Sequence, residues 1–206
     1  MKKIIFPFCL LFLVFWSQAA IGQTKKTAEN LKAAYEGESE ASAKYAAYAA
    51  QAKKEGLVPI ATLFEAASRA EAIHAANHKK VLEGMGIKPS DATPALTVKT
   101  TAENLADAKS GESYEITTMY PGFIATAKGE NEISAMKSFR WAMETEKKHM
   151  VMYQRALTAM QAKKTNGLPT LYWVCPKCGN TYDVAKPEAS CSFCGTAIAK
   201  YIRFGK

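Results

Sequence analysis

The sequence predicts a mainly α protein in which a four-helix bundle is followed by a small β-rich metal-binding domain. Two observations carry this prediction. Residues 27–31 (TAENL) recur 74 residues later as residues 101–105, and the GES triplet at 37–39 recurs at 111–113. Two CxxCG motifs lie near the C-terminus, in a segment without helical periodicity. We expect each repeat to form one helical hairpin, because helices joined by short turns pack antiparallel.

Turn and cap residues place the four helices. Gly56 and Gly129 mark the turn inside each hairpin, Thr27 is a capping residue, and Pro121 predicts a kink in the third helix. Residues 85–99 form the expected crossover between the hairpins. The expected helices cover residues 27–54, 59–83, 101–128 and 130–163.

The first 22 residues are typical of a secretory signal peptide. Positive charge precedes an apolar run over residues 4–16, and plausible cleavage points follow Ala19 and Gly22. The run is short for a membrane-spanning helix, and an uncleaved anchor is the alternative. We therefore expect an exported, periplasmic protein that loses Cys9 with the signal and has no stable membrane insertion after processing.

The basic charge does not predict a nucleic-acid partner. The formal net charge is +8 over 206 residues, and the lysines occur as dispersed pairs. These pairs are typical of solvated helix ends and faces, and no basic stripe interleaved with aromatic residues accompanies them.

A Glu-x-x-His spacing occurs once in each repeat and predicts a two-metal site. Residues three apart share a helix face, so each pair can converge on one ion. Each pair also follows a GES glutamate by 33 or 34 residues. One Glu from each of two helices, with Glu-x-x-His from the other two, is the ligand pattern of dinuclear carboxylate bundles. The predicted ligands are Glu38, Glu71, His74, Glu112, Glu146 and His149.

Glu115 is a seventh candidate ligand and breaks the symmetry of the repeat, since Ala41 stands at the corresponding place in the first half. Five carboxylates buried together require cations. Two iron ions supply a charge of +4 when ferrous and +6 when ferric, which favours a diiron centre.

Five further residues near this site have sequence-based interpretations. Gly37 and Gly111 lie mid-helix beside the GES glutamates, which suggests a close approach of helices there. Tyr45 and Tyr120 either donate hydrogen bonds to carboxylate ligands or fill the core. His78 has no histidine counterpart in the second repeat, and we expect it to be solvated.

The two CxxCG motifs predict a separate tetrathiolate site. Knuckles of this kind bind one zinc or iron ion, although paired cysteines in an exported protein can also form disulfides. Redox-active iron suits the neighbouring diiron site, because electrons need a route to it and zinc cannot change valence. We expect a bundle over residues 23–164, a linker over 165–170 and a metal domain over 171–206. The predicted ligands are Cys175, Cys178, Cys191 and Cys194, surrounded by an aromatic core of Tyr172, Trp173, Tyr182, Phe193 and Phe204.

The whole set of motifs resembles the rubrerythrin family. The resemblance rests on GES in the first helix, Glu-x-x-His in the second and fourth, GExxE followed by MYP at residues 119–121 in the third, and the rubredoxin-like cysteine tail. It implies a ferritin-like bundle with a rubredoxin-like domain. Two features depart from the family pattern: Ser192 replaces a usual proline, and an export signal is present in a family usually found in the cytoplasm.

The resemblance implies a non-haem diiron peroxidase that reduces hydrogen peroxide to water in oxidative stress defence. Electrons would pass from a redox-protein donor through the tetrathiolate iron site, and Zn is the alternative metal there. In the family one iron exchanges a glutamate for a histidine on reduction, and the matching positions are Glu115 and His74. The family is dimeric, with the tetrathiolate site of one subunit near the diiron centre of the other, so a homodimer is expected.

Two other functions use parts of the same pattern. A ferritin-like iron-oxidising or iron-storing protein would use these carboxylates with dioxygen, but it does not need the cysteine tail. A zinc-ribbon interaction protein would use the tail as a platform for a partner. Export also implies that the electron donor is a membrane or periplasmic redox protein.

Overall fold

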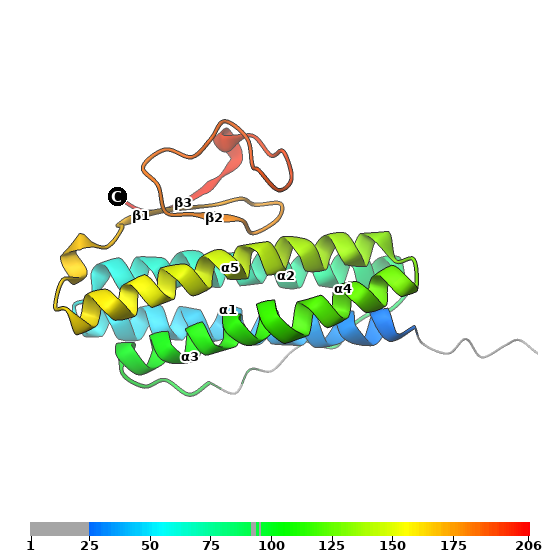
Figure 1. The fold of residues 1–206 in the computed structure, drawn as a ribbon, viewed down its shortest axis with the longest axis horizontal. Coiled ribbons are helices and arrows are strands. Elements are labelled where there is room, and N and C mark those ends of the chain that lie inside the picture. The colour runs from blue at the N-terminus through cyan, green and yellow to red at the C-terminus, as the bar shows by residue number, and fades with distance from the viewer. Residues whose placement is uncertain (1–24, 92–93, 95) are drawn as a thin grey trace, which may run out of the picture.

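The computed structural model describes residues 25–91, 94 and 96–206, and the predicted signal segment with Cys9 lies outside them. The chain folds into a four-helix bundle with a small three-stranded domain along one side (Figure 1). None of the helices in the described part of the chain has the length and apolarity that a bilayer crossing needs. The helical segments are α1 (Lys26–Lys54), α2 (Val58–Gly84), α3 (Thr101–Tyr114), the π-helix η1 (Glu115–Met119), α4 (Tyr120–Gly129) and α5 (Ile133–Gln161).

The turn of each hairpin caps the first helix of the other. Glu130 accepts hydrogen bonds from the backbone N–H groups of Lys26 and Thr27, both at 3.0 Å. Glu55 likewise accepts from the N–H of Thr101, at 3.0 Å. Thr27 is therefore not the helix cap that its sequence position predicts: α1 begins at Lys26, and the capping group comes from another helix end. These carboxylates satisfy helix donors that would otherwise lack partners.

Pro121 produces a π-helical turn in place of a simple kink. Proline has no N–H and its ring crowds the carbonyl four residues earlier, so the regular ladder cannot continue through it. The chain widens into η1 just before this residue and resumes α-helical geometry in α4. The extra residue between Glu112 and Tyr120, relative to Glu38 and Tyr45, falls in this segment. The π turn thus absorbs the single residue by which the two repeats differ in length.

The last helix is shorter than the sequence pattern predicts. Asn131 has a φ of 58° and breaks the helix after the Gly129 turn, so α5 starts at Ile133 instead of residue 130. Lys163 has a φ of 55° and similarly ends the helical path beyond Gln161. Left-handed backbone of this kind does not continue an α-helix.

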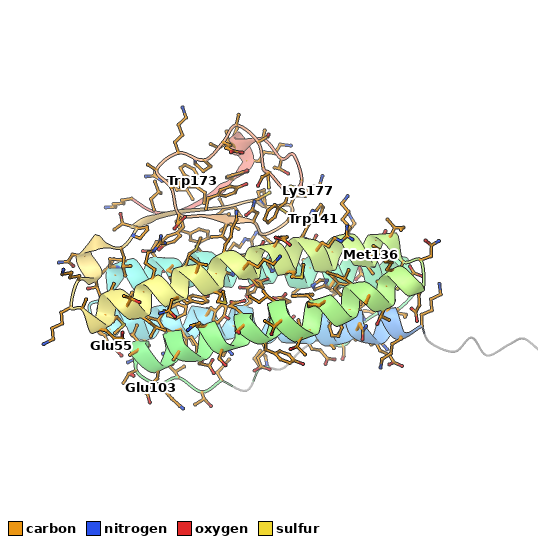
Figure 2. The ribbon with its side chains drawn as sticks, viewed as in Figure 1. Glu55, Glu103, Met136, Trp141, Trp173 and Lys177 are labelled. Atoms are coloured by element: carbon orange, nitrogen blue, oxygen red, sulfur yellow. The ribbon has the colours of Figure 1, made fainter. Side chains whose placement is uncertain are left out.

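The C-terminal domain packs directly on the bundle. Its strands are β1 (Leu171–Val174), β2 (Thr181–Tyr182) and β3 (Ile202–Gly205), in the antiparallel order β2-β1-β3. Tyr172 and Phe204 join the apolar cluster of the bundle, whereas Trp173, Tyr182 and Phe193 surround the cysteines. The predicted single aromatic core is therefore wrong, because the strands use one face to bind α2. Trp141 of α5 reaches into the contact from the bundle side (Figure 2).

Candidate metal centres

The six symmetric candidate ligands of the bundle meet in one buried layer. Each is at most 2 % exposed. Their donor atoms form two groups of four, within which all atoms lie within 4.8 Å of one another. Glu71 and Glu146 belong to both groups, so they stand where bridging carboxylates would. The groups are Glu38, Glu71, His74 and Glu146, and Glu71, Glu112, Glu146 and His149.

Both histidines face the shared carboxylates with the same ring nitrogen. His74 Nδ1 lies 2.9 Å from Glu71 Oε2 and 2.8 Å from Glu146 Oε1. His149 Nδ1 lies 3.0 Å from Glu71 Oε1 and 2.9 Å from Glu146 Oε2. The outer carboxylates stand a little further away, Glu38 at 3.7 Å from His74 Nδ1 and Glu112 at 3.8 Å from His149 Nδ1. The arrangement has the pseudo-twofold symmetry of the repeat.

The layer contains donor atoms that the protein itself does not satisfy. Among the described residues, Glu38 Oε2, both carboxylate oxygens of Glu146 and His149 Nδ1 are buried without a well-oriented hydrogen bond, although His149 Nδ1 and Glu146 Oε2 lie 2.9 Å apart. Unpaired buried carboxylates cost several kcal/mol, so this layer is unfavourable unless cations enter it. A set of carboxylate oxygens and imidazole nitrogens in this arrangement fits two iron ions.

The close burial of these carboxylates and histidines also shifts their pKa values. Burial, opposed by a hydrogen bond from His74, raises the pKa of Glu38 to about 8. Burial and nearby carboxylates raise the pKa of Glu112. Burial disfavours ionised Glu71, but the charge of His149 and hydrogen bonds from both histidines lower its pKa to about 2. Burial would lower the pKa values of both histidines, but the carboxylates raise them. In a metal-free protein, protons on these groups would take the place of the cationic charge that metal ions supply.

Glu115 lies outside both groups of four, at the first residue of the π-helix. Glu115 as a whole is partly exposed, unlike the other six candidate ligands of the bundle, which are buried. Burial of its carboxyl group and the charges of Glu38 and Glu112 nevertheless raise its pKa well above the usual range. The carboxyl group therefore faces the site, although His74 occupies the fourth place in the group that contains Glu38.

Tyr45 and Tyr120 donate hydrogen bonds across the repeat. The Tyr45 hydroxyl donates to Glu112 Oε1 at 2.8 Å, and the Tyr120 hydroxyl donates to Glu38 Oε1. Each tyrosine thus holds an outer carboxylate supplied by the opposite half. Both rings are also buried, so the two interpretations of the sequence hold together.

Two sequence-based interpretations near the site are wrong. His78 is 0 % exposed and hydrogen-bonded, not solvated. Its position four residues after His74 on the same helix face was the signal for burial. The helices also do not approach closely at Gly37 or Gly111, because a Cβ added at either residue would meet nothing within 4 Å.

The C-terminal domain contacts both histidines of the bundle from the outside. Thr181 Oγ1 lies 2.9 Å from His149 Nε2 and donates its own proton to the carbonyl of Gly179 at 3.1 Å. The threonine oxygen therefore accepts from His149 Nε2–H, which leaves Nδ1 free for a metal. Gly179 has a φ of +79°, and a Cβ there would lie 2.2 Å from His74 Nε2. Sequence reasoning found Gly179 only as the glycine of a CxxCG turn and missed Thr181, since only the fold brings the knuckle to the bundle.

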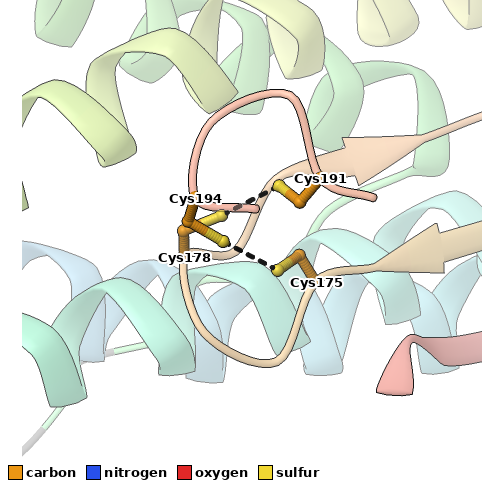
Figure 3. A group of neighbouring side chains, drawn as sticks. All are labelled: Cys175, Cys178, Cys191 and Cys194. Atoms are coloured by element: carbon orange, nitrogen blue, oxygen red, sulfur yellow. Dashed lines mark hydrogen bonds between the residues drawn. The ribbon is translucent and has the colours of Figure 1, made fainter. Parts of the chain in front are cut away.

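The four cysteines form a closed site in the same domain (Figure 3). The sulfurs of Cys175 and Cys194, and those of Cys178 and Cys191, are 3.5 Å apart and all four thiols are free. A disulfide needs about 2.05 Å, so this geometry excludes the disulfide alternative for the structure described. The hydrogen bond from Cys178, with backbone N–H groups of the knuckle, lowers the pKa of Cys175 to about 4. Thiolates in this arrangement suit one tetrahedral ion.

Comparison with known proteins identifies the family. A family model described as Rubrerythrin matches residues 29–157. The chain belongs to the rubrerythrin family. Rubrerythrin-2 of Clostridium acetobutylicum is 34 % identical over 179 residues, which cover 86 % of this chain and 96 % of the relative. Nigerythrin of Nitratidesulfovibrio vulgaris is 36 % identical over 166 residues, covering 79 % and 78 %.

A solved structure shares the architecture of both parts. The structure titled fully reduced nigerythrin (all ferrous) matches with a TM-score of 0.76 and 31 % identity, covering 92 % of this chain and 91 % of that one. The rubrerythrin fold therefore includes the bundle and the rubredoxin-like domain here. The carboxylate and histidine layer fits a diiron site, and the four cysteines fit a rubredoxin-like iron site.

The cysteine knuckle and the bundle site are in contact within one chain. The knuckle residues Gly179 and Thr181 touch the diiron ligands of their own chain. The resemblance predicted this proximity between two subunits. Within the described residues, one chain brings the cysteine knuckle to its own bundle site, and the expected proximity between subunits stays a prediction.

Proposed function

We propose that this member of the rubrerythrin family is a peroxidase that reduces hydrogen peroxide to water. The balanced reaction takes one peroxide, two electrons and two protons to two water molecules. The observation that carries the proposal is the direct contact of the cysteine knuckle with His74 and His149. An iron oxidation or storage protein has no need for a one-electron centre in contact with its diiron ligands.

Bound iron would supply the redox chemistry: each of the two bundle ions can give one electron. The chain's own residues supply the rest. Glu71 and Glu146, which belong to both groups, would hold both ions, and His74 and His149 would each hold one through Nδ1. Buried surroundings exclude bulk water from the layer. Gly179 and Thr181 of the cysteine knuckle contact Nε2 of the two histidines, and this contact would give electrons a short path from the tetrathiolate site.

Glu115 and His74 are proposed to exchange places at the position formed with Glu38. His74 lies in the group of four, and Glu115 begins the π-helix with its carboxyl group close enough to Glu38 to be affected by that charge. A π turn interrupts the regular ladder, and such turns are frequent at functional sites. Glu115 is partly exposed as a residue, whereas its carboxyl group is buried beside the other carboxylates.

Stopped-flow oxidation of the anaerobically reduced, iron-loaded mature protein tests the peroxidase function. Stoichiometric peroxide should oxidise the diferrous protein faster than dioxygen does. Faster oxidation by dioxygen would favour the ferritin-like alternative. Glu115→Ala should slow peroxide turnover while two irons stay bound, and loss of both irons would contradict the exchange role.

Metal counting and the visible spectrum test the relay. Ferric tetrathiolate absorbs strongly in the visible range, whereas zinc in the same site is colourless. A purified chain with colourless zinc at the cysteines would favour the interaction-protein alternative. A chain with iron there should pass electrons from a chemical reductant to the bundle.

We also propose export to the periplasm, an electron donor in the membrane or periplasm, and a homodimeric assembly. The proposal of export depends on the signal-like first 22 residues. Cell fractionation should find the processed chain in the periplasmic fraction, and a full-length cytoplasmic chain would contradict export. Sedimentation of the iron-loaded protein tests the dimer.

A further inference from the structure

A buried chain of hydrogen bonds extends from Glu38 away from the metal layer. The Tyr120 hydroxyl donates to Glu38 Oε1, and His78 Nε2 lies 3.2 Å from the Tyr120 oxygen. His78 Nδ1 lies 2.8 Å from the Ser138 hydroxyl. His78 is 0 % exposed, Tyr120 is 0 % exposed and Ser138 is 5 % exposed. Three helices, α2, α4 and α5, therefore contribute to one polar path inside the core.

The donor and the acceptor of each hydrogen bond in this path can be assigned by starting from Glu38. Glu38 is ionised when it holds a metal ion and then only accepts, so in the iron-loaded protein the single Tyr120 proton must go to it. The Tyr120 oxygen then accepts from His78 Nε2–H. Burial, followed by the charge of neighbouring His74, lowers the pKa of His78 to about 3, so the ring is neutral and carries one proton. Nδ1 is therefore an acceptor, and the Ser138 hydroxyl donates to it.

The other half of the repeat lacks this path. A shift of 75 residues relates His78 to Tyr153, and Ser138 to Leu63. On that side Tyr45 donates to Glu112, and the Tyr153 hydroxyl lies near Tyr45 without a well-oriented hydrogen bond. Leu63 is apolar, so no polar side chain follows in the place of Ser138. The tyrosine and the carboxylate are duplicated, whereas the histidine and serine behind them are present on the Glu38 side alone.

We propose that His78 and Ser138 are positioning residues that hold Tyr120 on Glu38 and give the metal position at Glu38 and His74 a reduction potential different from that of its twin. When the oxygen of a phenol accepts a hydrogen bond, the hydrogen bond that its own O–H donates becomes stronger. A stronger bond to Glu38 Oε1 withdraws electron density from that carboxylate, so Glu38 becomes a weaker ligand. A weaker anionic ligand favours the metal ion of lower charge.

A proton-donating role for His78 is disfavoured by the same geometry. Net delivery of a proton toward Glu38 would leave an alkoxide at Ser138 or require a cationic His78, and the buried ring resists protonation. The polar path also has no further hydrogen-bond partner beyond Ser138 within the described residues. The residues act by holding one orientation.

Reductive titration of the iron-loaded full mature protein tests the proposal. Ser138→Ala and His78→Leu should move the diiron couple to more negative potentials, by up to tenfold in the redox equilibrium constant, or about 59 mV for one electron. His78→Gln, which keeps an N–H donor toward Tyr120, should restore most of the shift. The tetrathiolate iron in the same molecule is the internal reference and should not move.

Tyr153→Phe is the matched comparison, because it alters the corresponding position in the other half. It should move the couple clearly less than the Ser138 and His78 variants, since Tyr153 has no well-oriented hydrogen bond to lose. If Ser138→Ala and His78→Leu behave like Tyr153→Phe, the proposal is wrong. Should His78→Leu fail to fold, Ser138→Ala decides the question alone. Nitrogen NMR of the zinc-loaded protein gives a second test: His78 should carry its proton on Nε2, and a proton on Nδ1 overturns the assignment.

Discussion

Thr181 connects the two domains through a single side-chain oxygen. It accepts from His149 Nε2–H and donates to the Gly179 carbonyl, which leaves the Thr181 oxygen in one fixed orientation. Partners of this kind orient the imidazole and set which nitrogen is free for the metal. At the scale of one residue, the C-terminal domain therefore decides the tautomer of a bundle ligand.

Thr181→Val should weaken metal binding in the bundle while leaving the tetrathiolate site intact. The valine removes the acceptor of His149 Nε2–H at nearly the same volume, and loss of such a partner costs about 10–100-fold in affinity. Competition with a chelator, read as iron retained in the bundle, measures the effect. Thr126→Val, which removes a hydroxyl from the exposed face of α4, is the control. Equal retention in both variants would contradict the role of Thr181.

The two knuckle glycines offer a matched pair of substitutions. Gly179 and Gly195 have φ values of +79° and +71°, but a Cβ would strike His74 only at Gly179. Gly195→Ala should cost about 1–2 kcal/mol from left-handed backbone alone. Gly179→Ala should cost clearly more and displace the domain from the bundle. Thermal unfolding of both variants measures the difference, and equal losses would show that the contact with His74 carries no energy.

Residue spacing predicted most of the site because the ligands obey two local rules. Glu71 with His74, and Glu146 with His149, share a helix face through the 3.6-residue period, and the CxxCG knuckles define their own turn. Thr181 follows no such rule, because its partner lies 32 residues away in sequence on another domain. His78 was predicted to be exposed because its counterpart is not a histidine, although Tyr153 there is buried as well.

At the scale of the element, the π-helix η1 is the main feature that the sequence did not reveal. Pro121 indicated an irregular helix, but a proline can either kink a helix or widen it into a π turn. The packing of the neighbouring helices decides which of the two forms. Here the widened turn returns Tyr120 to the face that Tyr45 occupies in the other half, eight residues after Glu112 where Tyr45 is seven after Glu38. The same turn begins with Glu115, the ligand candidate without a counterpart.

Deletion of the exposed Thr118 should remove the π turn. The spacing from Glu112 to Tyr120 would become the seven residues of the first repeat, which an ordinary α-helix accommodates. We expect a folded bundle that still binds two irons, with peroxide turnover reduced because Glu115 no longer sits on a widened turn. Metal counting and turnover assays measure this, with Thr118→Ala as the control. Unchanged turnover in the deletion variant would contradict a function for η1.

At the scale of the whole molecule, the buried layer links stability to pH in the metal-free form. Glu38 keeps its proton to about pH 8 when folded but releases it near pH 4.5 when unfolded. The folded form therefore binds more protons between these values, so its stability falls as the pH rises through that window. The raised pKa values of His74 and His149 act in the same direction above about pH 6.5.

The metal-free protein should therefore melt at a lower temperature at pH 8 than at pH 5, by an amount corresponding to a few kcal/mol. Glu71 does not oppose this trend, because its lowered pKa of about 2 changes stability only below pH 4.5. The iron-loaded protein should show a flatter profile, since cations replace the protons. Calorimetry at several pH values measures both forms, with Glu38→Gln as a variant of reduced slope. A melting temperature of the metal-free form that rises toward pH 8 would contradict the linkage.

The position of Gly179 and Thr181 over the outer nitrogens of His74 and His149 also sets an order of assembly. The cysteine knuckles hold their shape only around an ion, because metal binding and local folding are coupled in small sites of this kind. If the C-terminal domain loses its ion, Gly179 and Thr181 no longer cover His74 and His149, and solvent and chelators can reach these histidines. Loss of the ion at the cysteines would then also promote loss of the two bundle ions, so that the chain loses its iron as a unit.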